Sequence, residues 1–149
     1  MKMKRILTLM LVLTMFVSSL HITAAAEDGA GTEIQPRLSN IYVCEVDFDI
    51  TSTGFASIYF EYFGDPEVFE SATVEIYLEK RFLGVFWNRV DIGMPNNVWI
   101  DVFYEDNGYV DHTLQLTKKG TYRARFVMTF RGTGNEDDEL EKTVQATYE

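Results

Sequence analysis

The sequence contains few of the residues on which catalytic and disulfide-stabilised proteins depend. Its 149 residues include one cysteine, Cys44, and two histidines, His21 and His112. A lone cysteine excludes an intrachain disulfide framework and a zinc site built on paired cysteines. The G-x-S-x-G, H-E-x-x-H and P-loop motifs are also missing, so the sequence carries no familiar signature of an esterase, a metalloprotease or a nucleotide-binding protein.

Basic residues are scarce as well. The chain has 13 Lys and Arg against 23 Asp and Glu, which gives a formal net charge of −10. An acidic excess argues against binding to nucleic acid and to anionic lipid, because both partners are themselves negatively charged.

The N-terminus has the pattern of a secretory signal peptide. Three basic residues among the first five precede an apolar run over residues 6–20, and the segment ends in Ala24-Ala25-Ala26. Such a run is too short for a membrane span, and an A-x-A cleavage motif follows it. The sequence therefore predicts a signal peptide over residues 1–26, cleavage after Ala26 and a secreted protein that is not held by the membrane. This segment holds three basic residues and no acidic one, so its removal changes the net charge from −10 to −13.

The rest of the chain divides into a linker and one all-β domain. Residues 27–38 carry glycine, proline and charge without periodicity, which indicates a flexible linker. Residues 39–149 are long enough to bury a core as a single domain. Period-two alternation predicts a sandwich of seven to eight antiparallel strands without a helix. The expected strands lie at residues 41–50, 55–63, 73–79, 85–91, 98–104, 110–116, 122–131 and 140–148.

The strongest strand signal follows Gly120. Tyr122, Ala124 and Phe126 begin one apolar face, and arginines occupy the other. The short segment Leu114-Gln115-Leu116 and a turn precede it. We therefore expect Tyr122 to form a tyrosine corner, in which its hydroxyl binds the backbone of the preceding turn, with Gly120 as a structural turn residue.

A hairpin is predicted over the first two strands. A three-residue loop that ends at Gly54, in the left-handed conformation that glycine adopts without cost, pairs Ile50 with Ala56 and Phe48 with Ile58. This register sets Asp47 opposite Tyr59 and Glu45 opposite Glu61. The buried face of the first strand is then expected to consist of Tyr42, Cys44, Val46, Phe48 and Ile50.

The order of these patterns supports a resemblance. The hairpin, a Val-x-Ile-x-Leu strand at residues 74–78, the Leu-x-Leu-x-x-x-Gly-x-Tyr-x-Ala corner at residues 114–124 and a final alternating strand resemble a group of small secreted β-sandwich proteins from Gram-positive bacteria. That group, whose function is uncharacterised, is similar to immunoglobulin-like and fibronectin-III-like domains. The resemblance covers residues 39–149 and implies such a sandwich, but Ala124 stands where antibody domains have their second cysteine. Because sandwich folds host many functions, it implies no activity.

Two catalytic arrangements can be formulated. A Cys44–His112 dyad would supply a nucleophile and a base, but Cys44 lies on the apolar side of its strand, where cysteine is a buried and inert residue. Carboxylates on alternate strand residues, about 7 Å apart, would suit a two-carboxylate glycosidase. A solvated acidic face is the simpler interpretation of that set, which consists of Glu45, Asp47, Asp49 and Glu61.

Binding is better supported than catalysis. Acidic turns at residues 105–111 and 135–139 supply the oxygen ligands that calcium prefers, with Asp106, Asn107 and Asp111 as candidates, although neither turn has EF-hand spacing. Aromatic rings beside carboxylates are typical of sugar-binding sandwiches, and aromatic residues also fill cores. The candidates for an exposed aromatic site are Trp87, Trp99, Phe103 and Tyr109.

The sequence thus predicts a secreted, non-catalytic module without a required cofactor. We expect it to bind a protein partner or a cell-surface component through loops or an exposed edge strand. A carbohydrate-binding module is the first alternative, and a small carboxylate-dependent hydrolase is the second.

Overall fold

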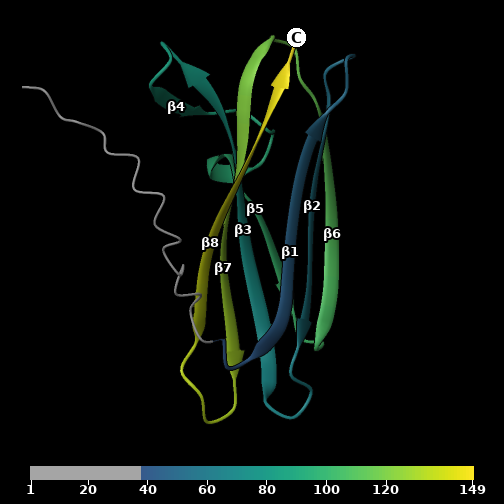
Figure 1. The fold of residues 1–149 in the computed structure, drawn as a ribbon, viewed down its shortest axis with the longest axis vertical. Helices are drawn as coiled ribbons and strands as arrows, with labels where there is room; N and C mark the ends of the chain where they lie inside the picture. The colour runs from purple at the N-terminus through teal and green to yellow at the C-terminus, as the bar shows by residue number, and fades with distance from the viewer. Residues whose placement is uncertain (1–37) are drawn as a thin grey trace, which may run out of the picture. The chain divides into compact units, whose positions relative to one another are not determined.

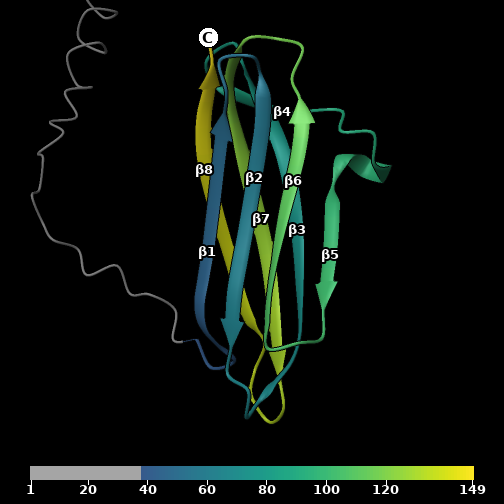
Figure 2. The ribbon, with the colours of Figure 1, turned by 90° about the vertical axis from the view of Figure 1, so that its right-hand side faces the viewer.

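The computed structural model describes residues 38–149, which form two antiparallel β-sheets packed face to face (Figures 1 and 2). The expected signal peptide and the linker up to residue 37 lie outside the described residues. The eight strands and the core between them all lie in the described part, so it has a hydrophobic core of its own, as an independently folding domain requires. The all-β prediction is confirmed. The strands are β1 (Ile41–Ile50), β2 (Phe55–Gly64), β3 (Phe69–Phe82), β4 (Phe86–Arg89), β5 (Trp99–Phe103), β6 (Asn107–Gln115), β7 (Gly120–Gly132) and β8 (Asp138–Tyr148).

One sheet has three strands and the other has five. The smaller sheet has the order β1-β2-β6, and the larger has the order β4-β3-β7-β8, with β5 also paired to β3. In Figure 1 the strands β8, β7 and β3 lie on the left and β1, β2 and β6 on the right. The strands β4 and β5 pair with successive parts of the same edge of β3, near Arg81 and near Val74 respectively.

The core forms where alternate residues of both sheets meet. Ile58, Phe60 and Tyr62 of β2 are fully buried, as are Ile76 of β3 and Phe126 of β7. Each belongs to the face that alternation predicts as apolar, because a strand buried on one side directs every second side chain inward.

The first hairpin has the predicted register. Ile50 pairs with Ala56 and Glu45 with Glu61, and Gly54 has a φ of 81°. The prediction for the start of β1 is wrong: Tyr42 is exposed, not buried. The register shifts between Ile41 and Val43, and such an irregularity moves a side chain to the other face.

Several strand boundaries differ from the expectation, most of all those of β3, β4 and β6. Strand β3 spans Phe69–Phe82 and so exceeds the expected range of residues 73–79 at both ends, whereas β4 is limited to four residues of the expected 85–91. Strand β6 begins at Asn107, within the expected acidic turn. Strands β3 and β6 gain residues because their pairing with neighbouring strands continues beyond the alternating segment, and local composition does not report such pairing.

Buried polar contacts fix the start of β1. The backbone N–H groups of Ser39 and Asn40 donate to the carboxylate of Asp138, with an N–O distance of 2.7 Å for Asn40. The Asn40 side chain is fully buried and donates to the carbonyl oxygens of Phe130 and Glu136. We call Asn40 and Asp138 the buried polar pair.

The tyrosine corner is present at the other end of the sandwich. The Tyr122 hydroxyl donates to the backbone carbonyl of Lys118, in the turn before β7. Gly120 has a φ of 140°, which a residue with a side chain rarely adopts. Both residues therefore have the structural positions that the sequence predicted.

Candidate functional site

The turn between β3 and β4 has an unusual backbone. Leu83 has a φ of 49° and Gly84 a φ of 76°, and the Val85 N–H donates to the Phe82 carbonyl at 3.3 Å. Positive φ at both central residues is the pattern of a type I′ hairpin turn, where Asn-Gly is preferred. Glycine adopts this conformation freely, but a leucine there costs about 1 kcal/mol. Leu83 is therefore not the residue that the turn itself favours.

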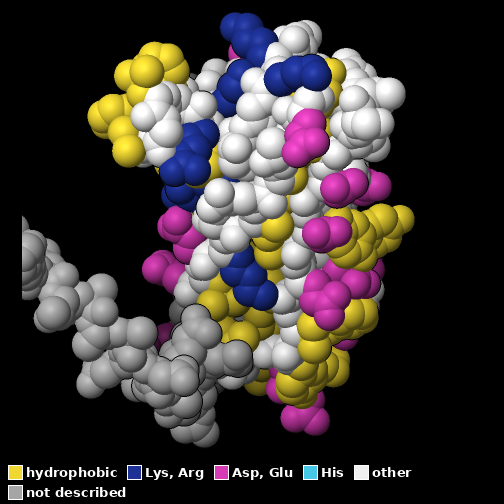
Figure 3. All heavy atoms as spheres, turned by 45° about the horizontal axis from the view of Figure 1, so that its top comes forward, with side chains coloured by type: hydrophobic (Ala, Val, Ile, Leu, Met, Phe, Trp, Pro, Cys, Tyr) yellow, Lys and Arg dark blue, Asp and Glu magenta, His cyan; other side chains and the backbone are white. Residues whose placement is uncertain are grey.

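The same turn exposes four large apolar side chains. Phe82, Leu83, Val85 and Phe86 are between 53% and 75% exposed. We call residues 82–86 the hairpin tip. Figure 3, in which the hairpin end comes toward the viewer, shows apolar side chains projecting at the upper left beside Lys and Arg side chains. Exposed apolar side chains that adjoin one another are typical of interaction sites, because contact with a partner removes their surface from water.

A groove lies beneath the hairpin. Its volume is about 640 Å³, and it lies between the hairpin and residues 114–118. Leu114 and Leu116 contribute apolar walls. Four cationic side chains and one carboxylate also line it: Lys80, Arg81, Arg89, Lys118 and Asp91. The groove thus combines apolar surface with positive charge next to the apolar hairpin tip.

Positive charge is concentrated at this end of an acidic protein. Four of the 13 basic residues lie outside the described part, which leaves nine. Five of the nine, namely Lys80, Arg81, Arg89, Lys118 and Lys119, belong to the hairpin or to the loop across the groove. Arg81 also holds the turn, because its Nε donates to the Gly84 carbonyl at 2.6 Å.

A ladder of arginine and aromatic side chains joins the hairpin to the outer face of the larger sheet. The Arg123 guanidinium lies 4.4 Å from the centre of the Trp87 ring, and its Nε lies 2.6 Å from Glu79 Oε2. Arg89 and Arg125 lie 4.3 Å and 4.5 Å from the centre of the Tyr77 ring. Such cation–π contacts contribute about 0.5–1 kcal/mol each at exposed sites.

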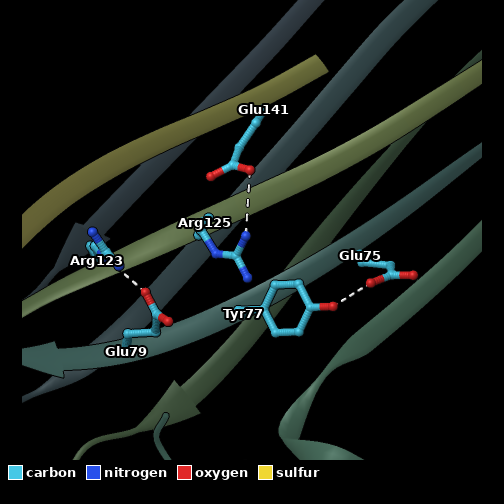
Figure 4. A network of polar contacts seen from close by, with 6 residues as sticks. All are labelled: Glu75, Tyr77, Glu79, Arg123, Arg125 and Glu141. Carbon is cyan, nitrogen blue, oxygen red and sulfur yellow. Dashed lines mark hydrogen bonds and ion pairs between the residues drawn. The ribbon is translucent and has the colours of Figure 1, made fainter. Parts of the chain in front are cut away.

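The acidic partners of this ladder are shown in Figure 4. Arg125 Nη1 lies 3.4 Å from Glu141 Oε2 on β8, and the Tyr77 hydroxyl donates to Glu75. That hydrogen bond is the main cause that raises the pKa of Tyr77. Through this ladder the short strand β4 makes side-chain contacts with β3 and β7. These contacts fix the position of the strand that carries the hairpin tip.

Two of the predicted aromatic residues pack inward, with Trp99 buried and Phe103 half-buried. Trp99 is buried and stacks on the His112 ring at a centroid distance of 5.1 Å. Phe103 packs against the rings of Phe60 and Tyr62 in the core. Trp87 lies on the outer face beneath Arg123, so Trp87 and Trp99 do not form one exposed row.

Tyr109 does remain exposed, and it has a neighbour that sequence analysis missed. Tyr104 and Tyr109 are both more than two-thirds exposed and line a shallow groove of about 440 Å³ with Glu105 and Asn107. Tyr104 follows β5 directly. Residues 98–104 have apolar side chains on both faces, so the sequence does not show that Tyr104 is exposed. The pairing of β5 with β3 shows which face is outside.

The residues of the hypothetical dyad lie in different surroundings. Cys44 Sγ is 3.4 Å from Met128 Sδ, and burial raises the pKa of the Cys44 thiol to about 11. His112 Nε2 instead lies 2.7 Å from Asp101 Oδ2, between β6 and β5. Cys44 is half-buried, so the expected full burial is wrong in degree. A protonated thiol without an adjacent base is a poor nucleophile.

The carboxylates of the first hairpin follow the predicted register and line the outer face of the smaller sheet. Three of the four are exposed and Glu61 is half-buried.

The calcium candidates make contacts of other kinds. Asp106 Oδ1 accepts a hydrogen bond from Asn107, and Asp111 accepts one from Ser57 across the smaller sheet. Over residues 38–149, no group of three or more His, Cys, Asp and Glu side chains has an arrangement that could hold a metal ion.

Comparison of the chain with protein-family models and with curated proteins finds no match. Within the described part, no helix is long and apolar enough to cross a membrane. The hairpin tip is thus assigned from its own geometry. Its signal in the sequence is the occurrence of Phe, Leu, Val and Phe in a segment that also reads as a turn, where polar residues are usual.

Proposed function

We propose that this protein is a secreted, non-catalytic binding module that attaches to its partner through the hairpin tip. One observation carries the proposal: four large apolar side chains are exposed at a turn whose backbone would favour Asn or Gly at the position of Leu83. Neither the core nor the turn gains from these residues. A contact made outside the domain accounts for them, because it would bury their apolar surface.

Further features support a binding role on a rigid scaffold. The arginine–aromatic ladder and the Arg81–Gly84 hydrogen bond hold the hairpin in one conformation. A preorganised contact surface loses little conformational entropy when it binds. The hydrogen bond of the Tyr122 corner supports the resemblance to immunoglobulin-like and fibronectin-III-like sandwiches, which are frequent binding scaffolds.

The test compares two pairs of substitutions in the chain from residue 27 onwards. Leu83→Asn with Val85→Thr makes the tip polar, and Ile100→Thr with Val102→Thr makes the same kind of change on β5, where both residues are also exposed. Each labelled variant is incubated with the cell envelope of the organism that encodes the chain. We expect the tip variant to be retained at least about tenfold less than the parent, since two apolar contacts are lost. Equal retention of all three proteins would contradict the proposal.

A second candidate function is glycan binding at the Tyr104–Tyr109 groove. The observation that favours it is a pair of exposed tyrosine rings beside Glu105 and Asn107, which offers stacking together with hydrogen-bonding groups. A panel of polysaccharides tests it with the Tyr104→Ala and Tyr109→Ala double variant. Binding by the parent that this variant loses and the tip variant keeps would place the glycan site at β5 and β6.

A further inference from the structure

We propose that the partner of the hairpin tip is an anionic lipid surface. The inference rests on the proposed function, because it names the chemical class of the partner at the same site. Three properties of the hairpin end support it: its apolar side chains, the internal pairing of its backbone and the sign of its charge.

The shape and composition of the tip fit insertion into a lipid interface. Its four apolar side chains lie at the turn of a two-stranded hairpin, so they can enter an apolar layer together without opening the core. Interfacial protein segments bind in this way, by burying apolar side chains at the boundary between headgroups and acyl chains. The cost of Leu83 in the left-handed region is then offset by transfer of its side chain out of water.

Two backbone carbonyls of the tip are paired within the hairpin. The Phe82 carbonyl accepts a hydrogen bond from Val85 N–H, and the Gly84 carbonyl accepts one from Arg81 Nε. A polar backbone group without a partner is costly in an apolar medium, so internal pairing lowers the cost of insertion. A tip that bound its partner through backbone hydrogen bonds would leave these carbonyl groups free for that partner.

Charge at the hairpin end is positive although the protein is acidic. Five Lys and Arg side chains lie at this end with the carboxylates of Asp91 and Glu149. Glu79, opposite Arg89 in the strand register, also lies here, and an ion pair with Arg123 balances its charge. The Debye length is about 8 Å at physiological ionic strength, so a surface at the tip senses mainly these nearby groups. The acidic face of the smaller sheet, with Glu45, Asp47 and Asp49, is a separate surface. The expectation drawn from net charge, that anionic lipid is disfavoured, therefore does not hold for this end.

The cations also lie at a suitable distance behind the tip to reach lipid headgroups when the tip is inserted. Arg81 and Arg89 lie on the strands just behind the tip, and Lys118 lies across the groove. Long basic side chains place their charge at the headgroups while apolar neighbours go deeper. The groove of about 640 Å³ offers these cations a common space in which a phosphate headgroup can be contacted.

The experiment measures sedimentation of the chain from residue 27 onwards with lipid vesicles, which avoids the apolar segment of residues 6–20. Vesicles of phosphatidylcholine alone are compared with vesicles that also contain phosphatidylglycerol. We expect binding to the anionic vesicles that weakens as salt is added. Leu83→Asn with Val85→Thr should weaken it by at least about tenfold. Lys118→Gln with Lys119→Gln should weaken it by about 25-fold, at roughly fivefold per cation.

Matched controls separate the site from general effects. Ile100→Thr with Val102→Thr and Arg131→Gln, which change an exposed apolar row and a cation near the other end of β7, should leave vesicle binding unchanged. Leu83→Trp should show more fluorescence quenching by lipids with brominated acyl chains than the parent, which already contains Trp87 and Trp99, and Ile100→Trp should show no more than the parent. An unfolding midpoint no lower than that of the parent shows that each variant is folded.

The outcomes distinguish the two proposals. Failure of the parent to bind anionic vesicles, or equal binding by the tip variant, overturns the lipid inference. If envelope retention still depends on the tip in that case, the partner is a protein and the proposed function stands. If neither vesicle binding nor retention depends on the tip, both proposals fail.

Discussion

Polar side chains are buried where β1 begins, whereas apolar side chains are exposed at the opposite end, where β3 turns into β4. Asn40 is fully buried and Asp138 nearly so, and their polar contacts are to backbone groups of the same end and, for Asn40, also to the Asn135 side chain. Leu83 and Val85 are the most exposed residues of the hairpin tip. Both ends depart from the usual distribution of side chains, but in opposite directions.

The difference indicates two different roles. A buried polar group with complete hydrogen bonds fixes a unique arrangement, and its loss leaves partners unsatisfied. An exposed apolar side chain on a strained turn contributes nothing to the folded state that a polar residue would not. We therefore expect substitutions at the buried polar pair to affect stability, and substitutions at the tip to affect binding alone.

The largest effect is expected for Asp138→Ala. It removes the acceptor of the Ser39 and Asn40 N–H groups, so the free energy of unfolding should fall by about 2–4 kcal/mol in denaturant titrations. Asp137→Ala is the matched control, because Asp137 contacts only an exposed arginine and should change stability by less than about 0.5 kcal/mol. Similar losses in both variants would remove the distinction between the two ends.

Cys44 reports whether the β1 end opens. Burial raises the pKa of its thiol from 9.0 to about 11, so below pH 9 the native thiolate fraction is about a hundredfold lower than in the unfolded chain. Alkylation of the native protein should be slower by this order, and its rate should rise with pH up to about 11. Asp138→Ala should speed it. Native labelling as fast as labelling in denaturant would show that this side of β1 is open.

Tyr122→Phe should lower stability by a smaller amount. It tests whether the Tyr122 hydrogen bond stabilises the hairpin end of the domain, below the exposed tip. Loss of the hydroxyl leaves the Lys118 carbonyl without its donor, which should lower the free energy of unfolding by about 1–2 kcal/mol. Tyr109→Phe is the control, since Tyr109 is exposed. An unchanged unfolding midpoint would deny the corner a stabilising role.

The smallest change in stability is expected for Leu83→Asn. Asparagine tolerates positive φ, so this variant should be as stable as the parent or more stable by up to about 1 kcal/mol. Val85→Thr, at a position with ordinary φ, should have no such gain. A marked loss of stability in Leu83→Asn would show that the tip packs on the domain and is not free for a partner.

Local pattern alone determined much of this fold. Alternation identified the buried faces of β2 and β7, since a one-residue slip would expose all of Phe60, Tyr62 and Phe126. Gly54 fixed the first hairpin because its loop needs a positive φ, and the Gly120–Tyr122 spacing located the corner. In each case the cause lies within a few residues of the chain.

Tertiary pairing decided the rest. Residues 98–104 alternate between two apolar faces, so the sequence could not say which one is inside. Pairing of Trp99 with Ile76 sends Trp99 and Phe103 inward and leaves Ile100 and Val102 exposed. Likewise, no local rule reveals that Phe82 and Phe86 extend past the core. Side-chain burial depends on which strand lies opposite, and only the folded chain supplies that partner.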